Sequence, residues 1–250
     1  MNKFIILMPL YNVESWIGLA LYTLKLQTYN NFECYIINDK STDNSQNIIE
    51  NIIKDDPRFT LINNNINNGS QLGNCLKAFD LSNPNNEDII IIHDGDDWLS
   101  SVFVLEYLNQ IYDQNMCWMT YGNEMQYPSM ETADHQMIEI PDVVDQQNLY
   151  RQFPFIYTHL RTSKSFLWKN LNRKDLIDPL TNDYFRHAAD VAVCIPFSEM
   201  CGKEKMYCIK DTLLILNRTN PESVHNTRLY KQKQAEAYIR TLTPYKKLQT

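Results

Sequence analysis

The sequence predicts an α/β fold in which a doubly wound, mostly parallel sheet carries helices on both faces. Short apolar runs alternate with amphipathic stretches through the first 100 residues, and this alternation is typical of parallel sheets built from β-α-β units. The four consecutive isoleucines of Ile89–Ile92 indicate a strand buried on both faces, since a half-exposed strand would alternate between apolar and polar residues.

The expected elements of the first half follow one another at short intervals. The strands are expected at residues 3–8, 34–38, 58–62 and 89–92. The helices are expected at 13–27, from the candidate capping residues 41–43 to about residue 54, and at 72–79. In a sheet of this kind ligands bind outside the carboxyl ends of the strands. The residues that follow these strands are therefore the first candidates for a functional site.

Two carboxylates follow the isoleucine strand. An extended chain places Asp94 and Asp96 on the same side, because side chains alternate with a period of two. Two like charges side by side repel unless a cation lies between them. A hard divalent ion such as Mg²⁺ or Mn²⁺, with diphosphate oxygens among its ligands, would satisfy both. The alternative is an ordinary acidic turn.

The other strand ends carry groups that suit a nucleoside. A tyrosine ring can stack on a base, and a carboxylate can accept hydrogen bonds from uracil N–H or from ribose hydroxyls. Neither of the glycine loops that cradle phosphate in Rossmann or P-loop proteins occurs in the sequence. The residues that we expect to bind the nucleotide are Pro9, Tyr11, Asp39, Asp94 and Gly95.

The composition excludes several classes of protein. The 250 residues suffice for one well-buried domain, and 23 basic against 30 acidic residues give a net charge of −7, which argues against a nucleic-acid partner. The six cysteines form no CxxC pair, which favours free thiols in a reducing compartment. No apolar run approaches the roughly 20 residues of a transmembrane segment. We therefore expect a soluble, cytoplasmic protein, one that could act at a membrane face.

The second half has a weaker pattern. A helix at 101–113 and a strand near 117–121 are expected to complete the sheet, and residues 122–150 are either an acceptor-side loop or a solvated linker. Two short strands are expected at 206–209 and 212–216, and a polar helix over 227–242.

Asp190 is the one acid in the apolar run 186–202, and it therefore needs a partner or a function. It could also be the N-cap of a helix over 191–200. His159 and Arg161 could contact an acceptor or a diphosphate, or they could be ordinary surface and capping residues.

Five motifs of the first 100 residues, in this order and spacing, resemble family 2 glycosyltransferases of the GT-A fold. They are Pro9-Leu10-Tyr11-Asn12, Gln27-Thr28-Tyr29, Ile36–Asp43, Asn67-Asn68-Gly69 and Asp94-Gly95-Asp96-Asp97. The chain departs from the family pattern at two places. Asn38 and Lys40 flank Asp39 where the family has an acid and a glycine, and Gln71–Asn74 replaces a segment that usually carries an arginine.

The resemblance implies roles for individual residues. Asp39 would contact the uridine, Tyr11 would line the base pocket, and Asp94 and Asp96 would bind ribose and metal. Asp190 stands where the family has its catalytic base, although Ala189 replaces the preceding glutamate.

The run Asn217–Pro221 followed by a histidine is similar to a subgroup of the family, which makes His225 the candidate for a further metal ligand; the alternative is an ordinary surface histidine. Arg218 could neutralise the leaving diphosphate, as arginine forks commonly do.

We therefore expect one GT-A domain over residues 1–250, with a nucleotide-binding half (1–100), an acceptor and catalytic half (101–225) and a C-terminal helix (226–250). The expected enzyme is an inverting, Mn²⁺- or Mg²⁺-dependent hexosyl- or N-acetylhexosaminyltransferase. It would move a sugar from a nucleotide sugar to a hydroxyl of a glycan, protein or lipid. The expected donor is a UDP-sugar. Two alternatives stay open: a non-catalytic sugar-nucleotide-binding module and a sugar nucleotidyltransferase.

Overall fold

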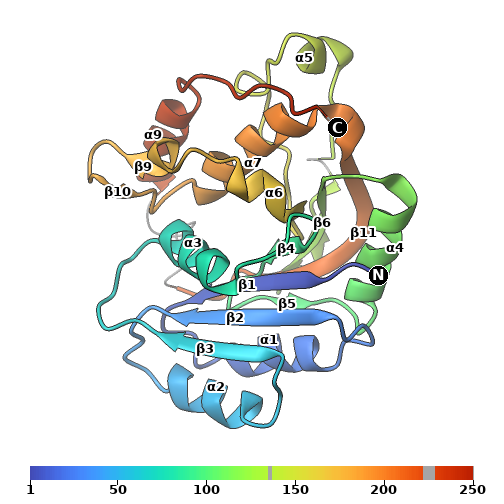
Figure 1. The fold of residues 1–250 in the computed structure, drawn as a ribbon. Helices are drawn as coiled ribbons and strands as arrows, with labels where there is room; N and C mark the ends of the chain where they lie inside the picture. The colour runs from blue at the N-terminus through green and yellow to red at the C-terminus, as the bar shows by residue number, and fades with distance from the viewer. Residues whose placement is uncertain (135–136, 222–228, 250) are drawn as a thin grey trace.

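The computed structural model describes residues 1–134, 137–221 and 229–249 (Figure 1). The elements of the first half are β1 (Phe4–Leu10), α1 (Ile17–Lys25), β2 (Phe32–Asn38), α2 (Ser45–Ile53), β3 (Phe59–Asn63), α3 (Gln71–Ser82), β4 (Ile89–Ile92) and β5 (Trp98–Leu99). Those of the second half are α4 (Val104–Asn115), β6 (Met119–Tyr127), β7 (Glu131–Thr132), α5 (Asp142–Gln146), β8 (Thr162–Lys164), α6 (Ser165–Lys169), β9 (Ile177–Asp178), β10 (Asp183–Tyr184), α7 (Ala189–Cys201), β11 (Met206–Asn217) and α9 (Leu229–Ile239).

The large sheet has the strand order β3-β2-β1-β4-β8-β6-β11-β5. The short strand β7 pairs with β6 near its C-terminal end, at Met125 and Gln126. Strands β3, β2, β1 and β4 are parallel to one another, as the alternating pattern predicts. Their carboxyl ends therefore lie at one edge of the sheet.

Helices cover both faces of this sheet, and Figure 1 shows α3, α6 and α7 above it with α1 and α2 below. The residues of β1 alternate between the two faces. Ile5 and Leu7 pack in one core with residues of α3 and α7, whereas Ile6 and Met8 pack in the other with residues of α1, α2 and α4. A strand buried on both sides needs no polar face, which explains the unbroken apolar sequences of β1 and β4.

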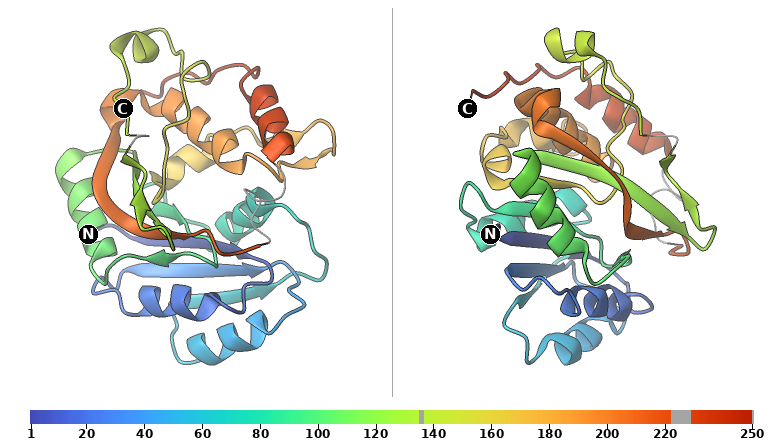
Figure 2. Two further views of the ribbon diagram at one scale, coloured as in Figure 1. Left: turned by 180° about the vertical axis from the view of Figure 1, so that it is seen from behind. Right: turned by 90° about the vertical axis from the view of Figure 1, so that its right-hand side faces the viewer.

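The second half differs from the expected elements in three ways. β8 lies between β4 and β6 and runs antiparallel to both, although no strand is expected there. β6 continues to Tyr127 into the region expected to be irregular. The two short strands expected near the C-terminus are one long strand, β11, which Figure 2 shows as a long curved arrow. It pairs in parallel with β6, with register shifts around Thr212. Such irregularities let a strand accommodate extra residues without losing its partner.

Helix α7 is buried along nearly its whole length, and it is covered by the C-terminal segment. Arg151 and Glu199, both almost fully buried, form an ion pair of 2.7 Å against this helix. The Tyr245 N–H donates to Glu199 at 3.0 Å, and the Leu248 N–H donates to the carbonyl of Met200 at 2.9 Å. The predicted polar helix thus corresponds to α9, and the residues after it pack on α7 in extended form.

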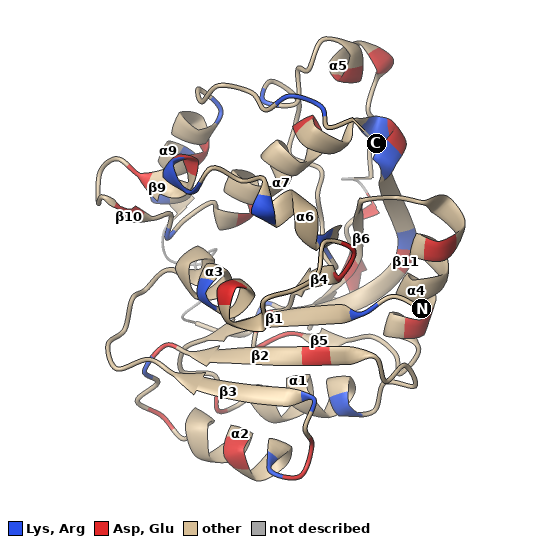
Figure 3. Ribbon diagram, in the orientation of Figure 1, with Lys and Arg blue, Asp and Glu red and all other residues tan. Residues whose placement is uncertain are grey.

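Basic and acidic residues are interspersed over both halves of the chain (Figure 3). All six cysteines are free, and five of them are buried, as the sequence predicts. Within the described residues, no helix is long and apolar enough to cross a membrane.

Candidate active site

The carboxyl ends of β1, β2 and β4 bring the predicted nucleotide-binding residues together. The Asp39 N–H donates to the carbonyl of Leu10 at 2.9 Å, and the His93 N–H donates to that of Leu7 at 3.0 Å. A Cβ added to Gly95 would lie 2.8 Å from Cβ of Leu10. Glycine is therefore needed at this position so that the segment after β4 can approach the end of β1.

Asp39 is buried, with 3 % of its surface exposed, and it holds the turn that precedes α3. Its carboxylate accepts hydrogen bonds from the Asn68 N–H at 3.0 Å, the Gly69 N–H at 2.9 Å and the Asn64 side chain at 2.7 Å. Gly69 has φ +62°, a conformation that favours glycine. A buried carboxylate with three donors is well satisfied, so the contact of Asp39 with a uridine stays a prediction.

The loops after β1 and β2 are fastened to each other. The Asn12 side chain accepts from the Thr42 N–H at 2.8 Å, and the Glu14 N–H donates to Asp43 at 2.9 Å. Tyr11, at the start of the first loop, is 39 % exposed. Its ring lies at the edge where the parallel strands end and is accessible for stacking.

The acidic run after β4 is held by neutral amides. Asp94 accepts from the side chain of Gln71, Asp96 from the side chain of Asn220 at 2.7 Å, and buried Asp97 from the Asn217 N–H at 2.8 Å. Burial and the negative charge of Asp94 raise the pKa of Asp96 to about 6. Burial and the neighbouring carboxylates also raise the pKa of Asp97.

This run has the chemistry of a site for a hard divalent cation. Carboxylate oxygens are the ligands that Mg²⁺ and Mn²⁺ prefer. Burial and the charge of Asp94 both disfavour the charged form of Asp96, and a bound cation would favour it. Within residues 1–134, 137–221 and 229–249, no three His, Cys, Asp or Glu side chains form a complete metal site. His225, the predicted additional ligand, lies outside the described residues.

Across from the acidic run, β6 contributes a carboxylate that the sequence does not single out. Glu124 accepts from the His159 Nδ1 at 2.7 Å and from the His159 N–H at 3.1 Å, and Arg218 Nη2 lies 3.8 Å from its other oxygen. Burial alone would raise the pKa of Glu124, but the hydrogen bonds and charge of His159 lower it to about 2.

Asp190 has the partner that its position requires. It lies in the first turn of α7, where one oxygen accepts from the Val191 N–H at 2.9 Å and the other lies 3.3 Å from Arg161 Nη2. The N-cap prediction is wrong, because α7 begins at Ala189 and its cap is Ala188. An acid inside the first turn is still stabilised by the helix dipole. The Asp190 side chain is 28 % exposed, so it is accessible to a ligand.

The structure places the predicted donor-side residues at one edge of the sheet. In the second half, His159 and Arg218 meet at Glu124, and Arg161 contacts Asp190. Sequence reasoning missed Gln71, Glu124 and Asn217. For Asn217 the Asn-x-x-Asn-Pro run was the available signal, and for Gln71 it was the departure of Gln71–Asn74 from the family pattern. For Glu124 no local pattern exists. A separate hollow of about 360 Å³, between the segment 137–140 and β11, is lined by none of the candidate residues.

Comparison with known proteins agrees with the predicted family and fold. The family model described as "Glycosyl transferase family 2" matches residues 5–190. An uncharacterised glycosyltransferase, EpsJ, of Bacillus subtilis (strain 168) is 25 % identical over 88 % of this chain and 62 % of its own length. An uncharacterised glycosyltransferase of Haemophilus influenzae is 34 % identical over 47 % of this chain and 45 % of its own length. The chain thus spans about half to three fifths of the length of these two relatives.

Two solved structures share the fold. S. aureus TarS 1–349 in complex with UDP has a TM-score of 0.68 at 16 % identity, over 95 % of this chain and 65 % of that one. The mannosyltransferase PcManGT of Pyrobaculum calidifontis, in complex with GDP-Man and Mn²⁺, has a TM-score of 0.56 at 14 % identity, over 88 % of this chain and 57 % of that one. At these identities the likeness shows the GT-A type of fold alone.

Proposed function

Because the chain belongs to glycosyl transferase family 2, it is a glycosyltransferase, and we propose that it transfers a sugar from a UDP-sugar to a hydroxyl acceptor with inversion at the anomeric carbon. One observation carries the proposal: a series of side-chain contacts leads from the acidic run after β4 to Asp190. Asn217 and Asn220 donate to Asp97 and Asp96, and Arg218, between them in the chain, lies 3.8 Å from Glu124. Glu124 accepts from His159, and Arg161, two residues on, contacts Asp190. Family membership argues against the sugar-nucleotidyltransferase alternative.

The first half would bind the donor. Tyr11 offers an exposed ring for the base, and Pro9 and Asp39 would form the rest of the base pocket. Asp94 and Gly95 would contact the ribose and diphosphate. TarS has been solved in complex with UDP-GlcNAc, which supports a UDP-linked hexose or N-acetylhexosamine as the donor. We assign residues 1–100 to this role, 101–225 to the acceptor and catalysis, and 226–250 to a C-terminal appendage.

Mn²⁺ or Mg²⁺ would be held by Asp96, with His225 as a further ligand. The ion, when bound, supplies positive charge to the departing diphosphate. The PcManGT complex contains Mn²⁺, which supports this choice of ion. The guanidinium of Arg218, 32 % exposed and only loosely paired with Glu124, would contact the same leaving group.

Asp190 would act as the general base. Its carboxylate would take the proton of the acceptor hydroxyl while the hydroxyl oxygen attacks the anomeric carbon from the face opposite the phosphate, and the bond to the diphosphate breaks. One displacement of this kind inverts the configuration. Arg161 would hold the carboxylate in position, since it reaches Asp190 at 3.3 Å and donates to the carbonyl of Tyr157 at 2.6 Å.

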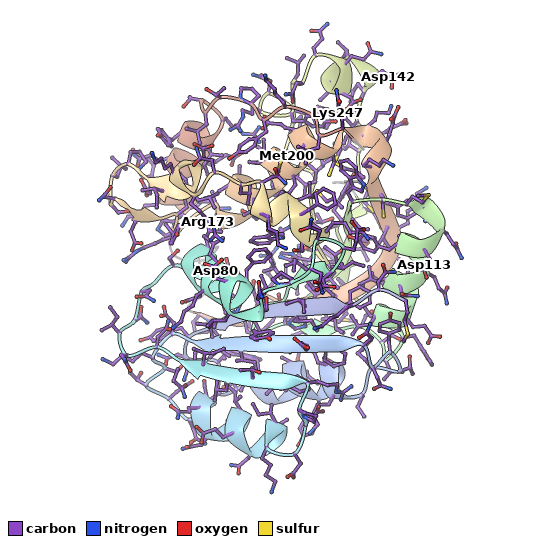
Figure 4. The ribbon with its side chains drawn as sticks, in the orientation of Figure 1. Asp80, Asp113, Asp142, Arg173, Met200 and Lys247 are labelled. Atoms are coloured by element: carbon purple, nitrogen blue, oxygen red, sulfur yellow. The ribbon has the colours of Figure 1, made fainter. Side chains whose placement is uncertain are left out.

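Release of UDP tests this proposal. The purified protein with Mn²⁺ should release UDP from one member of a panel of UDP-sugars, and a chelator should stop the reaction. Asp190→Asn should lower kcat by about 10²–10⁴-fold and leave the affinity for UDP unchanged. Asp113→Asn, on the far surface of α4 (Figure 4), is the matched control and should have normal kcat. A normal kcat for Asp190→Asn would exclude it as the base.

A further inference from the structure

The segment that leads into α7 packs directly on the turn that Asp39 holds. The Ser70 hydroxyl donates to the carbonyl of Phe185 at 3.1 Å. A Cβ added to Gly73 would lie 3.2 Å from the ring of Tyr184, and a Cβ added to Gly69 would lie 3.1 Å from Nη1 of Arg186. Three consecutive residues, 184–186, thus lie against the turn before α3 and the first turn of that helix. This contact joins the donor half to the helix that carries Asp190.

Arg186 is placed by this packing against the backbone of the turn. Its guanidinium carbon would be 3.5 Å from the Cβ that Gly69 lacks. The N–H of Gly69 itself donates to Asp39, so the guanidinium and the Asp39 carboxylate lie on the same short turn. Gln71, two residues further, reaches Asp94. The turn therefore connects both groups of donor-side carboxylates, and Arg186 lies on it.

The arginines of the part of the chain that the structure describes form two groups by the length of their ion pairs. Arg58, Arg151, Arg173 and Arg240 have ion pairs of 2.7–2.8 Å. Arg161, Arg186 and Arg218 have looser ones, of 3.3, 3.4 and 3.8 Å. The pair between Arg186 and Asp183 is 45 % exposed on both sides, and exposed pairs contribute little. The guanidinium of Arg186 can therefore change partner at little cost.

We propose that Arg186 binds the diphosphate of the donor from the acceptor half; this inference rests on the proposed function. A guanidinium presents planar, paired donors that match phosphate oxygens. A diphosphate bound beside the carboxylates of Asp94 and Asp96 would be repelled by them, so it needs cationic contacts there. Arg186 lies four residues before Asp190, and the bound donor would therefore also position the start of α7. A phosphate group on the acceptor could bind the same guanidinium. Measuring UDP binding in the absence of acceptor distinguishes the donor diphosphate from such an acceptor.

The test compares UDP with uridine, which lacks the phosphates. Titration calorimetry with Mn²⁺ should show that Arg186→Gln weakens UDP binding about 10- to 100-fold and leaves uridine binding unchanged. Arg186→Lys keeps the charge without the fork and should weaken UDP binding by less. Arg173→Gln removes an arginine that pairs with Asp80 at 2.7 Å on the outer side of α3 (Figure 4) and should change neither.

Equal weakening of UDP and uridine binding by Arg186→Gln would mean that Arg186 only supports the turn, and unchanged UDP binding would mean that it does not contact the diphosphate. Either result overturns the inference. If Arg186→Gln does not fold, the same comparison of UDP with uridine binding is made with Arg186→Lys. Absence of UDP and uridine binding in the wild-type protein would instead contradict the proposed donor.

Discussion

Asp39 and Glu124 are both buried carboxylates beside the candidate active site, but they are stabilised by different kinds of partner. Asp39, on the donor side, accepts from two backbone N–H groups and one amide. Glu124, on the acceptor side, accepts from His159 and lies near Arg218. The donor side uses backbone and neutral amides, and the acceptor side uses opposite charges. The charged form of Asp39 is therefore stabilised by the geometry of the backbone turn, whereas that of Glu124 is stabilised mainly by one side chain, His159.

The largest effect is expected at the buried ion pair of the acceptor half. Glu199→Gln leaves the guanidinium of Arg151 buried without its counter-charge, and this should lower the free energy of unfolding by about 3–5 kcal/mol. Burial raises the pKa of Glu199 in spite of Arg151. The double variant Arg151→Met/Glu199→Leu removes both charges and should be more stable than the single one. Urea unfolding measures both, and a double variant less stable than Glu199→Gln would contradict the comparison.

An opposite pair of effects is expected at Glu124 and Asp96. The pKa of Glu124 is lowered from 4.5 to about 2, so its charged form stabilises the fold above pH 4.5 and this contribution is lost as the pH falls toward 2. The pKa of Asp96 is raised from 3.8 to about 6, so its charged form destabilises the fold above pH 6. This destabilisation disappears as the pH falls from 6 toward 3.8.

At pH 7.5 and without metal, Glu124→Gln should therefore lower the free energy of unfolding by about 2–3 kcal/mol, and Asp96→Asn should raise it by about 1–2 kcal/mol. At pH 4.5 the gain from Asp96→Asn should shrink, while most of the loss from Glu124→Gln should persist. Urea unfolding at the two pH values provides the measurement. Changes of the same sign at pH 7.5 would show that the two sides do not differ.

The smallest effect tests the backbone geometry of the donor side. Gly95→Ala places a Cβ 2.8 Å from Cβ of Leu10, so one of the two segments must move, and we expect a loss of about 1–3 kcal/mol together with weaker UDP binding. The control is Gly18→Ala in α1, where the nearest atom is 3.9 Å away; it should be stabilising by about 0.5–1 kcal/mol. Thermal unfolding distinguishes them, and equal melting temperatures would show that the close approach can relax.

The sequence alone predicts the parallel part of the sheet and the position of the donor-side residues. Apolar periodicity is a local property of the sequence. A short apolar run predicts each of the four parallel strands, β1, β2, β3 and β4. Polar residues that directly follow parallel strands must lie at one edge of the sheet. The proximity of Tyr11, Asp39 and Asp94 can therefore be predicted without the tertiary structure.

Only the tertiary structure decides the partners of the acceptor side. β8 has three residues, Thr162–Lys164, too few for a recognisable period, and it becomes a strand because β4 and β6 supply its hydrogen bonds. The partners of Glu124 and Asp190 are side chains 35 and 29 residues away, and no pattern in the sequence marks them. A buried charge requires a counter-charge, but the identity of that counter-charge depends on which elements pack together.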